Sequence, residues 1–413
     1  MVTVPDVSDW SRRTTPTVPR RLPIDIPQTP GEITADWLTD VVRSSGLVTG
    51  ARVVGFEVGS PGSGVGFTGQ TLRVGLTWDT VEDDAPAAVL VKFPSENVGN
   101  RGLAEAEGGY DREFDFYERF AHLVPIRVPR LLHAVRDPGP STVARKRRER
   151  LIDGLPAPVA KLIGRHARNL IRATHRRYAL VLEYVPDSRV TTAQALPPPA
   201  DLAEILETLA RLHAHFWRHP VLADPAVVEW SMVTQMPNVM HGLYRAWRDE
   251  VVERRPDLFT ERFMVHADWF GDNIARLVAH LDEPLALRHG DSRTDNMLFT
   301  ETGMVLIDFG VSGSGRPAGD VAYLLSESIP PGPDARETFL ASCREYHAQL
   351  VAAGVDDHPL DVFLVDCEVV LAVQAYRTVL IEAAYEADYE GESLAEIWAP
   401  RIGAQLAEVP PEI

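Results

Sequence analysis

The chain has 413 residues, and its 59 acidic against 41 basic side chains give a formal net charge of −18 with histidine neutral. This balance argues against a general nucleic-acid binder, because neutralising phosphates requires a positive surface. Hydrophobic residues make up 45% and charged residues 24%, an ordinary globular composition that excludes a fibrous or largely disordered protein. At about 150 residues per domain, the length predicts two or three domains.

Neither a signal peptide nor a membrane-spanning helix is indicated by the apolar runs of the sequence. The two cysteines, Cys343 and Cys367, are too few to crosslink a chain of this length. We therefore expect a soluble, cytoplasmic protein with ordinary buried thiols.

The first half of the sequence predicts a sheet with few helices. Six prolines within residues 1–30 indicate an extended arm. Thr34 can cap a helix whose apolar face begins at Trp37. The patterns that follow predict an antiparallel meander of three strands, one helix and two further strands. These elements cover residues 52–58, 71–78, 88–93, 110–122, 128–135 and 178–185.

The second half is mainly helical. Apolar side chains recur every three or four residues from Leu202 to Phe216, which is the stripe of an amphipathic helix. Further helical patterns cover residues 335–352 and 360–388, and a short loop-and-strand region lies near 285–312.

The change of pattern predicts an α+β fold with two lobes and a cleft between them. After the arm at 1–30, a mainly antiparallel β N-lobe would cover residues 31–186. A mainly α-helical C-lobe would cover residues 187–413.

The strongest functional signal is RHGDSRTDNMLF, residues 288–299, followed by MVLIDFG. Phosphoryl transfer to an alcohol needs a carboxylate near the hydroxyl and oxygen ligands for magnesium beside the phosphates. Asp291, Asn296 and Asp308 supply these groups, and their spacing fits a catalytic loop that leads into a β-hairpin. Either aspartate alone could be a turn or cap residue, but the combination is specific.

Upstream, Gly64, Gly66 and Gly69 form a glycine-rich turn. The residues after it, TLRVGLTW, have the pattern of a strand, whereas a dinucleotide-binding turn would open a helix. We therefore predict a hairpin that covers nucleotide phosphates, with a plain tight turn as the alternative.

Lys92 lies in the apolar run AVLVKFP, where an ammonium group is costly to bury unless it meets an anion. It is a natural partner for nucleotide phosphates, although a lysine on an edge strand would reach solvent instead. A carboxylate on the next helix should hold it. Glu113 is the best candidate, because aromatic residues three, four and seven positions further on share its helical face. Glu105 and Glu107 are alternatives, and Glu113 could also be solvated.

Together these motifs resemble the aminoglycoside phosphotransferase and choline kinase group of small-molecule kinases, which shares the two-lobed protein-kinase-like fold. HGDSRTDNMLF and the preceding LARLHAHFW look most like the ecdysteroid kinase-like branch. The resemblance covers residues 35–390. It implies transfer of the γ-phosphoryl group of ATP to a hydroxyl of a small organic molecule, with Mg²⁺ as the second cofactor.

The resemblance also implies residue roles. Asp291 would be the catalytic base, Asn296 and Asp308 would hold magnesium, and His289 would brace the catalytic loop. Lys92 would contact the inner phosphates.

Glu113 would pair with Lys92, the lysine that contacts the phosphates. At the other end of the nucleotide, the backbone between Glu183 and Val185 would meet the adenine edge.

Two departures from the protein-kinase pattern favour a small-molecule acceptor. Gly290 replaces the arginine of the usual His-Arg-Asp triplet. Only eleven residues separate Asp308 from Asp320, and no Ala-Pro-Glu follows, so a peptide-docking segment has little room. Asp320 itself should be a helix cap or a brace for the catalytic loop.

The acceptor is expected between this loop and the late helices, where several polar residues are available. They are Glu368, Tyr376, Arg377, Glu382 and Tyr385. An antibiotic-modifying kinase, a protein kinase and a non-catalytic nucleotide-binding module are the alternative functions. The joint presence of the lysine, the two aspartates and the asparagine argues against the last of these.

Residues 145–177 contain eleven lysines and arginines against only Glu149 and Asp153, a local charge of +9. We interpret them as part of a basic insertion, about 137–177, between two N-lobe strands, with an amphipathic helix in its second half. The helix could pack on the lobe with its charges in water. Alternatively it could contact anionic lipid or an acidic surface, or capture an anionic substrate.

Overall fold

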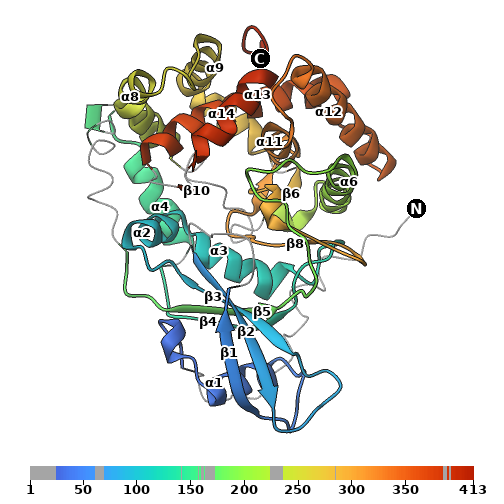
Figure 1. Cartoon of the computed structure of the whole chain (residues 1–413). Helices are drawn as coiled ribbons and strands as arrows, with labels where there is room; N and C mark the ends of the chain where they lie inside the picture. The colour runs from blue at the N-terminus through green and yellow to red at the C-terminus, as the bar shows by residue number, and fades with distance from the viewer. Residues whose placement is uncertain are drawn as a thin grey trace.

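The computed structural model describes residues 25–60, 69–140, 142–156, 158, 159, 162, 173–223, 236–283, 285–384, 388, 389 and 392–413. Gly64 and Gly66, most of the predicted arm and most of the predicted basic helix therefore lie outside the described residues. Figure 1 shows the N-lobe sheet at one end of the molecule and the C-lobe helices at the other.

A five-stranded antiparallel sheet forms the N-lobe. Its strands are β1 (Val53–Gly59), β2 (Gly69–Trp78), β3 (Ala88–Pro94), β4 (Leu131–Arg136) and β5 (Tyr178–Glu183). They lie in the order β1-β2-β3-β5-β4, and each strand is antiparallel to its neighbours. The predicted meander and both later strands are confirmed. The continuous apolar sequence of β5 reflects burial on both faces of the sheet.

The two faces of the sheet pack against different partners. Helix α1 (Ala35–Ser44) covers one face, where Trp37 joins Val181 of β5 in a buried cluster. Its start is capped as predicted, because the Thr34 hydroxyl accepts a hydrogen bond from the Trp37 amide at 3.1 Å. The opposite face carries Leu180 into a larger cluster that continues through the C-lobe.

Helices α2 (Val98–Glu107) and α3 (Gly109–Asp115) follow β3, and a π-helical turn, η3 (Phe116–Phe120), continues α3. The helix predicted over 110–122 is thus interrupted in its hydrogen bonding, and α2 was not predicted. The extra residue of the π-turn shifts the helical phase, so that three aromatic side chains are buried together. One of them, Phe116, stacks on Phe309 of the C-lobe with ring centroids 3.6 Å apart.

The C-lobe is built around a long helix, α13 (Leu360–Ala384). It packs against α8 (Pro237–Arg254), α9 (Glu261–Asp272), α11 (Ala318–Ser328), α12 (Ala335–Ala352) and α14 (Leu394–Gln405). Among the described residues, helices α6 (Pro199–His215) and α10 (Ile274–Leu281) also belong to the C-lobe. It contains two short 3₁₀ turns, η4 (Pro220–Ala223) and η5 (Thr294–Asn296). A third described turn of this kind, η2 (Pro30–Glu32), precedes α1.

One predicted helix is too long. The pattern over 360–388 indicates a single helix, but α13 ends at Ala384 and Asp388 belongs to a two-residue strand, β10 (Asp388–Tyr389). This strand pairs with β11 (Glu392–Ser393), and Ser393 then caps α14 through a capping box. The turn and capping chemistry of this segment therefore outweighs its helical propensity.

Two short hairpins in the C-lobe position the candidate site. Strand β6 (Ala286–Arg288) pairs with β9 (Gly313–Gly315), and β7 (Met297–Thr300) pairs with β8 (Gly303–Leu306). With the sheet of the N-lobe and the helices of the C-lobe, they complete the α+β, protein-kinase-like fold that the sequence predicts. The lobe boundary between residues 186 and 187 stays a prediction.

Helix α4 (Thr142–Asp153) lies in the basic segment that joins β4 to β5. In the part of the chain that the structure describes, no helix is long and apolar enough to span a bilayer. Cys343 and Cys367 are buried free thiols.

Candidate active site

The loop between β6 and β7 bends sharply at Gly290. This residue has a φ of +83°, and a Cβ atom there would lie 2.2 Å from the carbonyl oxygen of Val311. A side chain of any length is therefore excluded at the position where protein kinases carry arginine. The neighbouring Asp308 is also left-handed, with a φ of 65°.

A fully buried carboxylate, Asp320 of α11, holds this loop. It accepts hydrogen bonds from the backbone amides of His289 at 2.7 Å and Gly290 at 2.8 Å. His213 of α6 lies 3.1 Å from the same carboxylate. Burial alone would raise the pKa of Asp320, but these partners lower it below its ordinary value, so the brace stays charged. Asp320 thus occupies the bracing position expected for it.

His289 uses both ring nitrogens within the loop. Nε2 lies 2.8 Å from the carbonyl oxygen of Ile307, to which it donates, and Nδ1 accepts the amide of Asp291 at 3.3 Å. The ring also packs edge-on against Phe309, with centroids 4.8 Å apart. This geometry suits a brace, whereas a direct catalytic role would need a free ring nitrogen.

Asp291 lies at the centre of a polar cluster. The Tyr323 hydroxyl donates to its Oδ1 at 2.8 Å, the Asn296 amide donates to its Oδ2 at 2.9 Å, and Arg293 Nε lies 3.3 Å from Oδ1. Burial alone would raise the pKa of Asp291, but the positive charge of Arg293 and the Tyr323 hydrogen bond hold it below its usual range. The carboxylate is therefore ionised and oriented.

Sequence reasoning missed two members of this cluster. Tyr323 lies three residues after Asp320, and residues with that spacing share one face of a helix. That spacing could have identified it. Arg293, inside the motif at residues 288–299, offered no separate signal for its buried contact with Asp291.

The hairpin predicted after the catalytic loop is confirmed. Met297 of β7 pairs with Leu306 of β8, and the Ile307 amide donates to the carbonyl oxygen of Asn296 at 3.0 Å. This pairing brings Asp308 back beside Asn296, as its twelve-residue spacing predicts.

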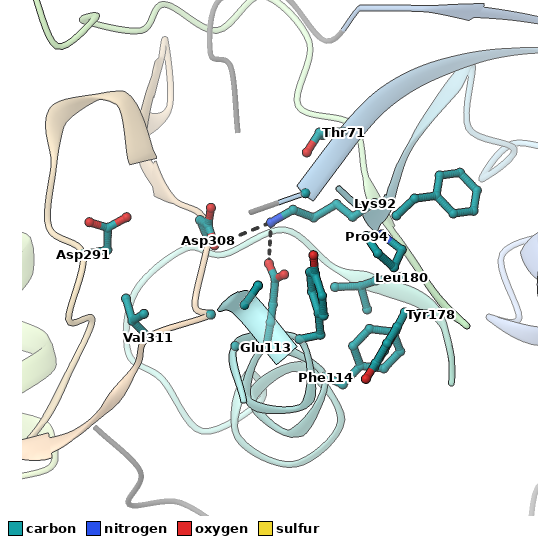
Figure 2. Close-up of a pocket in the computed structure, with 16 residues that line it drawn as sticks. Thr71, Lys92, Pro94, Glu113, Phe114, Tyr178, Leu180, Asp291, Asp308 and Val311 are labelled. Carbon is teal, nitrogen blue, oxygen red and sulfur yellow. Dashed lines mark hydrogen bonds and ion pairs between the residues drawn. The ribbon is translucent and has the colours of Figure 1, made fainter. Parts of the chain in front are cut away.

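Lys92 of β3 points from the sheet toward α3 and the loop at Asp308. Its Nζ lies 2.6 Å from Glu113 Oε1 and 3.7 Å from Asp308 Oδ1, as Figure 2 shows. Burial would lower the pKa of Lys92, but these two carboxylates raise it above its ordinary value, so the ammonium group stays charged. Of the alternative partners, Glu105 pairs with Arg101 at 3.2 Å, and the side chain of Glu107 is not described.

A cavity opens between β2, β3, α3 and the two catalytic loops. Its polar lining includes Thr71, Lys92, Glu113, Asp291 and Asp308 (Figure 2). Gly69 also lines it. The structure therefore brings together one predicted glycine, the predicted lysine with its partner, and both predicted aspartates.

Four predicted residues do not line this cavity. His289 and Asn296 lie behind Asp291. The Glu183 amide donates to the carbonyl oxygen of Arg130 at 2.8 Å within the sheet, and the carbonyl of Val185 accepts the Ser188 hydroxyl at 3.2 Å. Contact of this backbone with adenine stays a prediction.

The oxygen donors at the cavity suit a hard cation. Among the described residues, no group of three or more His, Cys, Asp or Glu side chains is arranged to hold a metal ion. Asn296 and Asp308 offer two oxygen donors, and the Asp308 side chain is 36% exposed. Magnesium bound beside phosphates takes its other ligands from phosphate and water, so two protein ligands fit it.

The predicted acceptor residues on α13 mostly serve other contacts. A carboxylate oxygen of Glu368 lies 2.7 Å from a guanidinium nitrogen of Arg336, and one of Glu382 lies 3.3 Å from a guanidinium nitrogen of Arg254. The ring of Tyr376 stacks on that of Tyr244, with centroids 4.4 Å apart. Tyr385 lies outside the described residues.

Arg377 of the same set contacts Tyr323 of α11, a member of the cluster around Asp291. Its guanidinium carbon lies 4.8 Å from the centroid of the Tyr323 ring. Tyr323 in turn holds Asp291.

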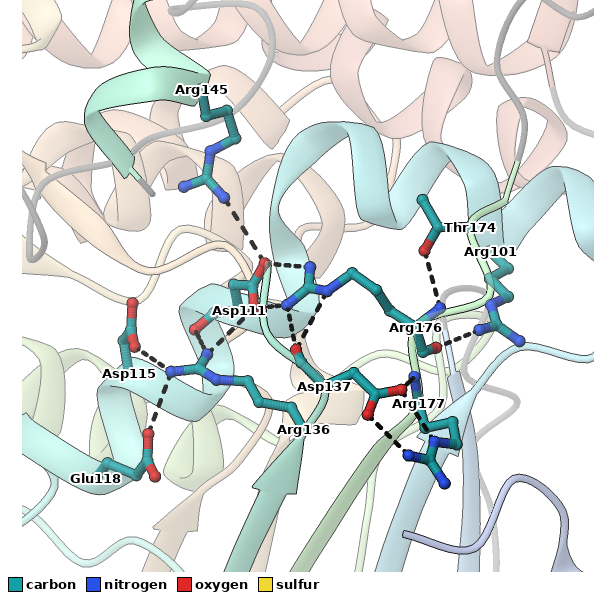
Figure 3. Close-up of polar contacts among 10 residues, drawn as sticks. All are labelled: Arg101, Asp111, Asp115, Glu118, Arg136, Asp137, Arg145, Thr174, Arg176 and Arg177. Carbon is teal, nitrogen blue, oxygen red and sulfur yellow. Dashed lines mark hydrogen bonds and ion pairs between the residues drawn. The ribbon is translucent and has the colours of Figure 1, made fainter. Parts of the chain in front are cut away.

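On its outer side, α3 is anchored by Asp111, two residues before Glu113. Arg176 donates two hydrogen bonds to the Asp111 carboxylate at 2.9 and 2.8 Å, and Arg136 donates to the Asp111 carbonyl oxygen at 2.8 Å (Figure 3). Burial alone would raise the pKa of Asp111, but these arginines hold it below its ordinary value. The end of β4 and the end of the basic insertion are thereby tied to the helix that carries Glu113.

A family model described as the phosphotransferase enzyme family, APH, matches residues 81–350. The match covers most of the chain, including Lys92, Glu113, Asp291 and Asp308. The chain belongs to this phosphotransferase family.

Solved structures with similar folds share little sequence with this chain. A choline kinase from Cryptosporidium parvum is 14% identical, with 84% of this chain and 87% of that chain covered and a TM-score of 0.46. An amicoumacin kinase in complex with AMP-PNP, Ca²⁺ and Ami is 12% identical, with 83% and 88% covered and a TM-score of 0.45.

A thermostable mutant of aminoglycoside phosphotransferase APH(4)-Ia, in ternary complex with ADP and hygromycin B, is 14% identical, with 88% of this chain and 96% of that chain covered and a TM-score of 0.43. The comparison with curated proteins finds no match.

Replacing Gly290 by alanine should destabilise the protein by about 2–5 kcal/mol, because strain at positive φ adds to the clash with Val311. Urea unfolding measures the loss. Gly46 has a similar φ of +78° but nothing within 4 Å of its ideal Cβ position, so Gly46→Ala isolates the strain. Equal losses in the two variants would show that the close approach to Val311 does not matter.

Glu327, one helical turn after Tyr323, is a buried carboxyl group near Arg293. Burial raises its pKa to about 8; the positive charge of Arg293 opposes the rise, and the negative charges of Asp295 and Asp291 add to it. At neutral pH this side chain is mostly protonated.

The free energy of unfolding should fall as pH rises from about 4.5 to about 8, because the folded state binds the Glu327 proton more tightly than the unfolded chain does. The slope from this group is at most about 1.4 kcal/mol per pH unit. Glu327→Gln should remove this pH dependence. From pH 5.5 to 7.5, the free energy of unfolding of the unmodified protein should therefore fall by about 2–3 kcal/mol more than that of the variant, as measured by urea unfolding. The exposed Glu345→Gln is the control, and a Glu327→Gln profile parallel to the unmodified protein would contradict the assignment.

Asp111→Asn should weaken the binding of magnesium–ATP, because α3 loses its anchor and Glu113 loses its position against Lys92. Asp137→Asn is the matched control: Asp137 also makes two hydrogen bonds to one arginine, Arg177, but it does not belong to α3. Both variants should lose about 1–3 kcal/mol of stability. Calorimetry should show weaker nucleotide binding only for Asp111→Asn, and the same affinity in both variants would refute the positioning role.

Proposed function

We propose that the chain is an ATP-dependent kinase that transfers a γ-phosphoryl group to a hydroxyl of a small organic molecule. The observation that carries this proposal is the convergence of Lys92, Asp308 and Asp291 on one cavity. These groups provide a fixed cation for phosphates, a metal ligand and an ionised carboxylate for the acceptor. Membership of the phosphotransferase family supports the same reaction class.

Asp291 acts as the base in this proposal. Its lowered pKa keeps it ionised at neutral pH, and its contacts with Tyr323 and Arg293 fix its orientation. It aligns the acceptor hydroxyl and takes up its proton as the oxygen forms a bond to the γ-phosphorus. The bond between that phosphorus and the bridging oxygen breaks, and ADP leaves with the electron pair.

Lys92 provides the positive charge for the nucleotide. The ammonium group is held between Glu113 and Asp308, so its position is set before any nucleotide arrives. Gly69 lets the start of β2 lie close to the backbone of β3, since a Cβ there would lie 3.0 Å from the Phe93 carbonyl oxygen. Asn296 and Asp308 would hold Mg²⁺, which when bound neutralises negative charge on the phosphates.

The segment after Asp308 supports a small acceptor. Residues of β9 are buried and pair with β6, so the chain returns directly into the C-lobe. A peptide substrate would need an exposed segment there on which to dock. An aminoglycoside-type acceptor remains the alternative within this reaction class.

Asp291→Asn should lower phosphoryl transfer by at least about 100-fold, because the variant cannot accept the hydroxyl proton. Magnesium–ATP affinity should stay within about threefold, since the side chain keeps its size and its Asn296 and Tyr323 neighbours. Asp295→Asn is the matched control: Asp295 also lies near Arg293, at 3.4 Å, but does not line the cavity. Transfer is measured by incubating the protein with ATP and a metabolite extract and recording products heavier by one phosphoryl group.

Full activity in Asp291→Asn would refute the role of this residue. Nucleotide binding without a phosphorylated product in any extract or antibiotic panel would instead favour a non-catalytic nucleotide-binding module.

A further inference from the structure

In helix α4, charged side chains are buried and apolar side chains are exposed. Its inner side buries a charged pair, Arg145 and Glu149, whose closest atoms lie 3.9 Å apart and whose residues are only 8% and 3% exposed. Its outer side presents Val143 and Leu151, which are 72% and 68% exposed. A helix that simply covers a globular core shows the opposite arrangement. Burial in the N-lobe therefore does not explain its apolar residues.

The same outer side is strongly basic. Arg147, Arg148 and Arg150 are exposed, and helical spacing places them around Val143 and Leu151. We define these five residues as the α4 face. Leu155, Val159 and Leu162, which follow the helix, are also 37%, 40% and 55% exposed.

Exposed apolar side chains are concentrated in this segment. Of the sixteen large apolar side chains that are exposed among the described residues, five lie between residues 143 and 162. An exposed apolar cluster rimmed by charges marks an interaction surface.

The inner contacts of α4 keep this face outward. Arg145 Nη1 lies 4.0 Å from the Asp111 carboxylate of α3 (Figure 3). At the other end, Asp153 accepts hydrogen bonds from the amides of Asn238 at 2.8 Å and Val239 at 3.0 Å, where α8 begins. The helix is thus attached to both lobes through its polar side.

We propose that the α4 face docks onto an anionic lipid bilayer. Its arginines would lie at the headgroup level, where each gains electrostatic attraction, and Val143 and Leu151 would enter the boundary of the acyl chains. The charge distribution favours this orientation, because residues 145–177 carry +9 and the remainder of the chain carries −27.

An acidic protein would also attract the arginines, but the composition of the face favours lipid. Protein interfaces are enriched in aromatic anchors, and the α4 face has only aliphatic ones. Arginines beside exposed aliphatic side chains suit a bilayer surface, where the guanidinium groups meet lipid phosphates and the aliphatic groups meet the acyl boundary.

The test uses the full chain and sedimentation with vesicles of phosphatidylcholine, alone or with about 30% phosphatidylglycerol, at low and high salt. We expect binding to the anionic vesicles only, weakened by salt. The double variant Arg147→Gln/Arg148→Gln should bind about 25-fold more weakly, roughly fivefold for each arginine. Arg52→Gln/Arg344→Gln removes the same charge from exposed sites elsewhere and should bind like the unmodified protein within about threefold.

A second pair of variants tests the aliphatic contacts. Val143→Ser/Leu151→Ser should bind about tenfold more weakly at every salt concentration, because apolar burial is not screened. Val351→Ser/Val362→Ser, at positions 42% and 37% exposed, is the control. Unchanged magnesium–ATP affinity shows that each variant is folded.

Three outcomes would overturn the proposal. The first is no binding to anionic vesicles at low salt, and the second is equal binding by the α4-face variants and their controls. The third is binding to polyglutamate but not to vesicles, which would assign the face to an acidic protein partner.

Discussion

The charge of Lys92 is the constraint on which the arrangement of this protein depends. An ammonium group within an apolar strand is stable only when nearby anions compensate it. Here the two anions come from different parts of the chain, Glu113 on α3 and Asp308 after the C-lobe hairpin. One buried cation therefore connects the sheet, the helix behind it and the opposite lobe. The Phe116–Phe309 stack connects the same two segments through apolar contact, one helical turn away.

Helix α3 is held from two sides, because it has acidic residues on both. Glu113 faces the cavity, whereas Asp111 faces the arginines of β4 and the basic insertion. Part of the positive charge of the insertion is thus neutralised within the lobe, since Arg176 and Arg177 both pair with carboxylates. Arg147, Arg148 and Arg150, on the outer side of α4, have a different environment because they are exposed. The net charge of −18 is accordingly the sum of an acidic body, an internally neutralised anchor and an exposed basic face.

The sequence predicted what depends on local pattern and on chemical necessity. Strand alternation located the sheet, and the spacing from Asn296 to Asp308 fitted a hairpin because antiparallel strands return the chain to its start. The pairing of Lys92 with a carboxylate followed from the cost of burying charge. Glu113 was selected correctly, although the three aromatic residues used to select it lie in the π-turn that follows it.

Contacts that depend on tertiary structure could not be read from the sequence. Asp111 and Arg176 are 65 positions apart, and nothing in a basic helical pattern indicates which arginine will meet a carboxylate. The other contacts made by most of the acceptor residues expected on α13 could not be predicted, for a related reason. That helix is apolar around its circumference and packs against several neighbours, so its periodicity defines no single outward face on which Glu368 or Tyr376 could be placed.

Asp291 and Glu327, two of the carboxyl groups near Arg293, show how burial can produce opposite charge states within one site. Asp291 receives hydrogen bonds from Tyr323 and Asn296 and lies next to the guanidinium group, so its pKa is lowered and it stays ionised. Glu327 is also buried, but burial outweighs its attraction to Arg293, and its pKa rises to about 8. A second anion beside Asp291 would raise the pKa of the base and repel the phosphates of a nucleotide. Protonation of Glu327 at neutral pH avoids that repulsion, and Arg293 then faces the side chains of Asp291 and Asp295.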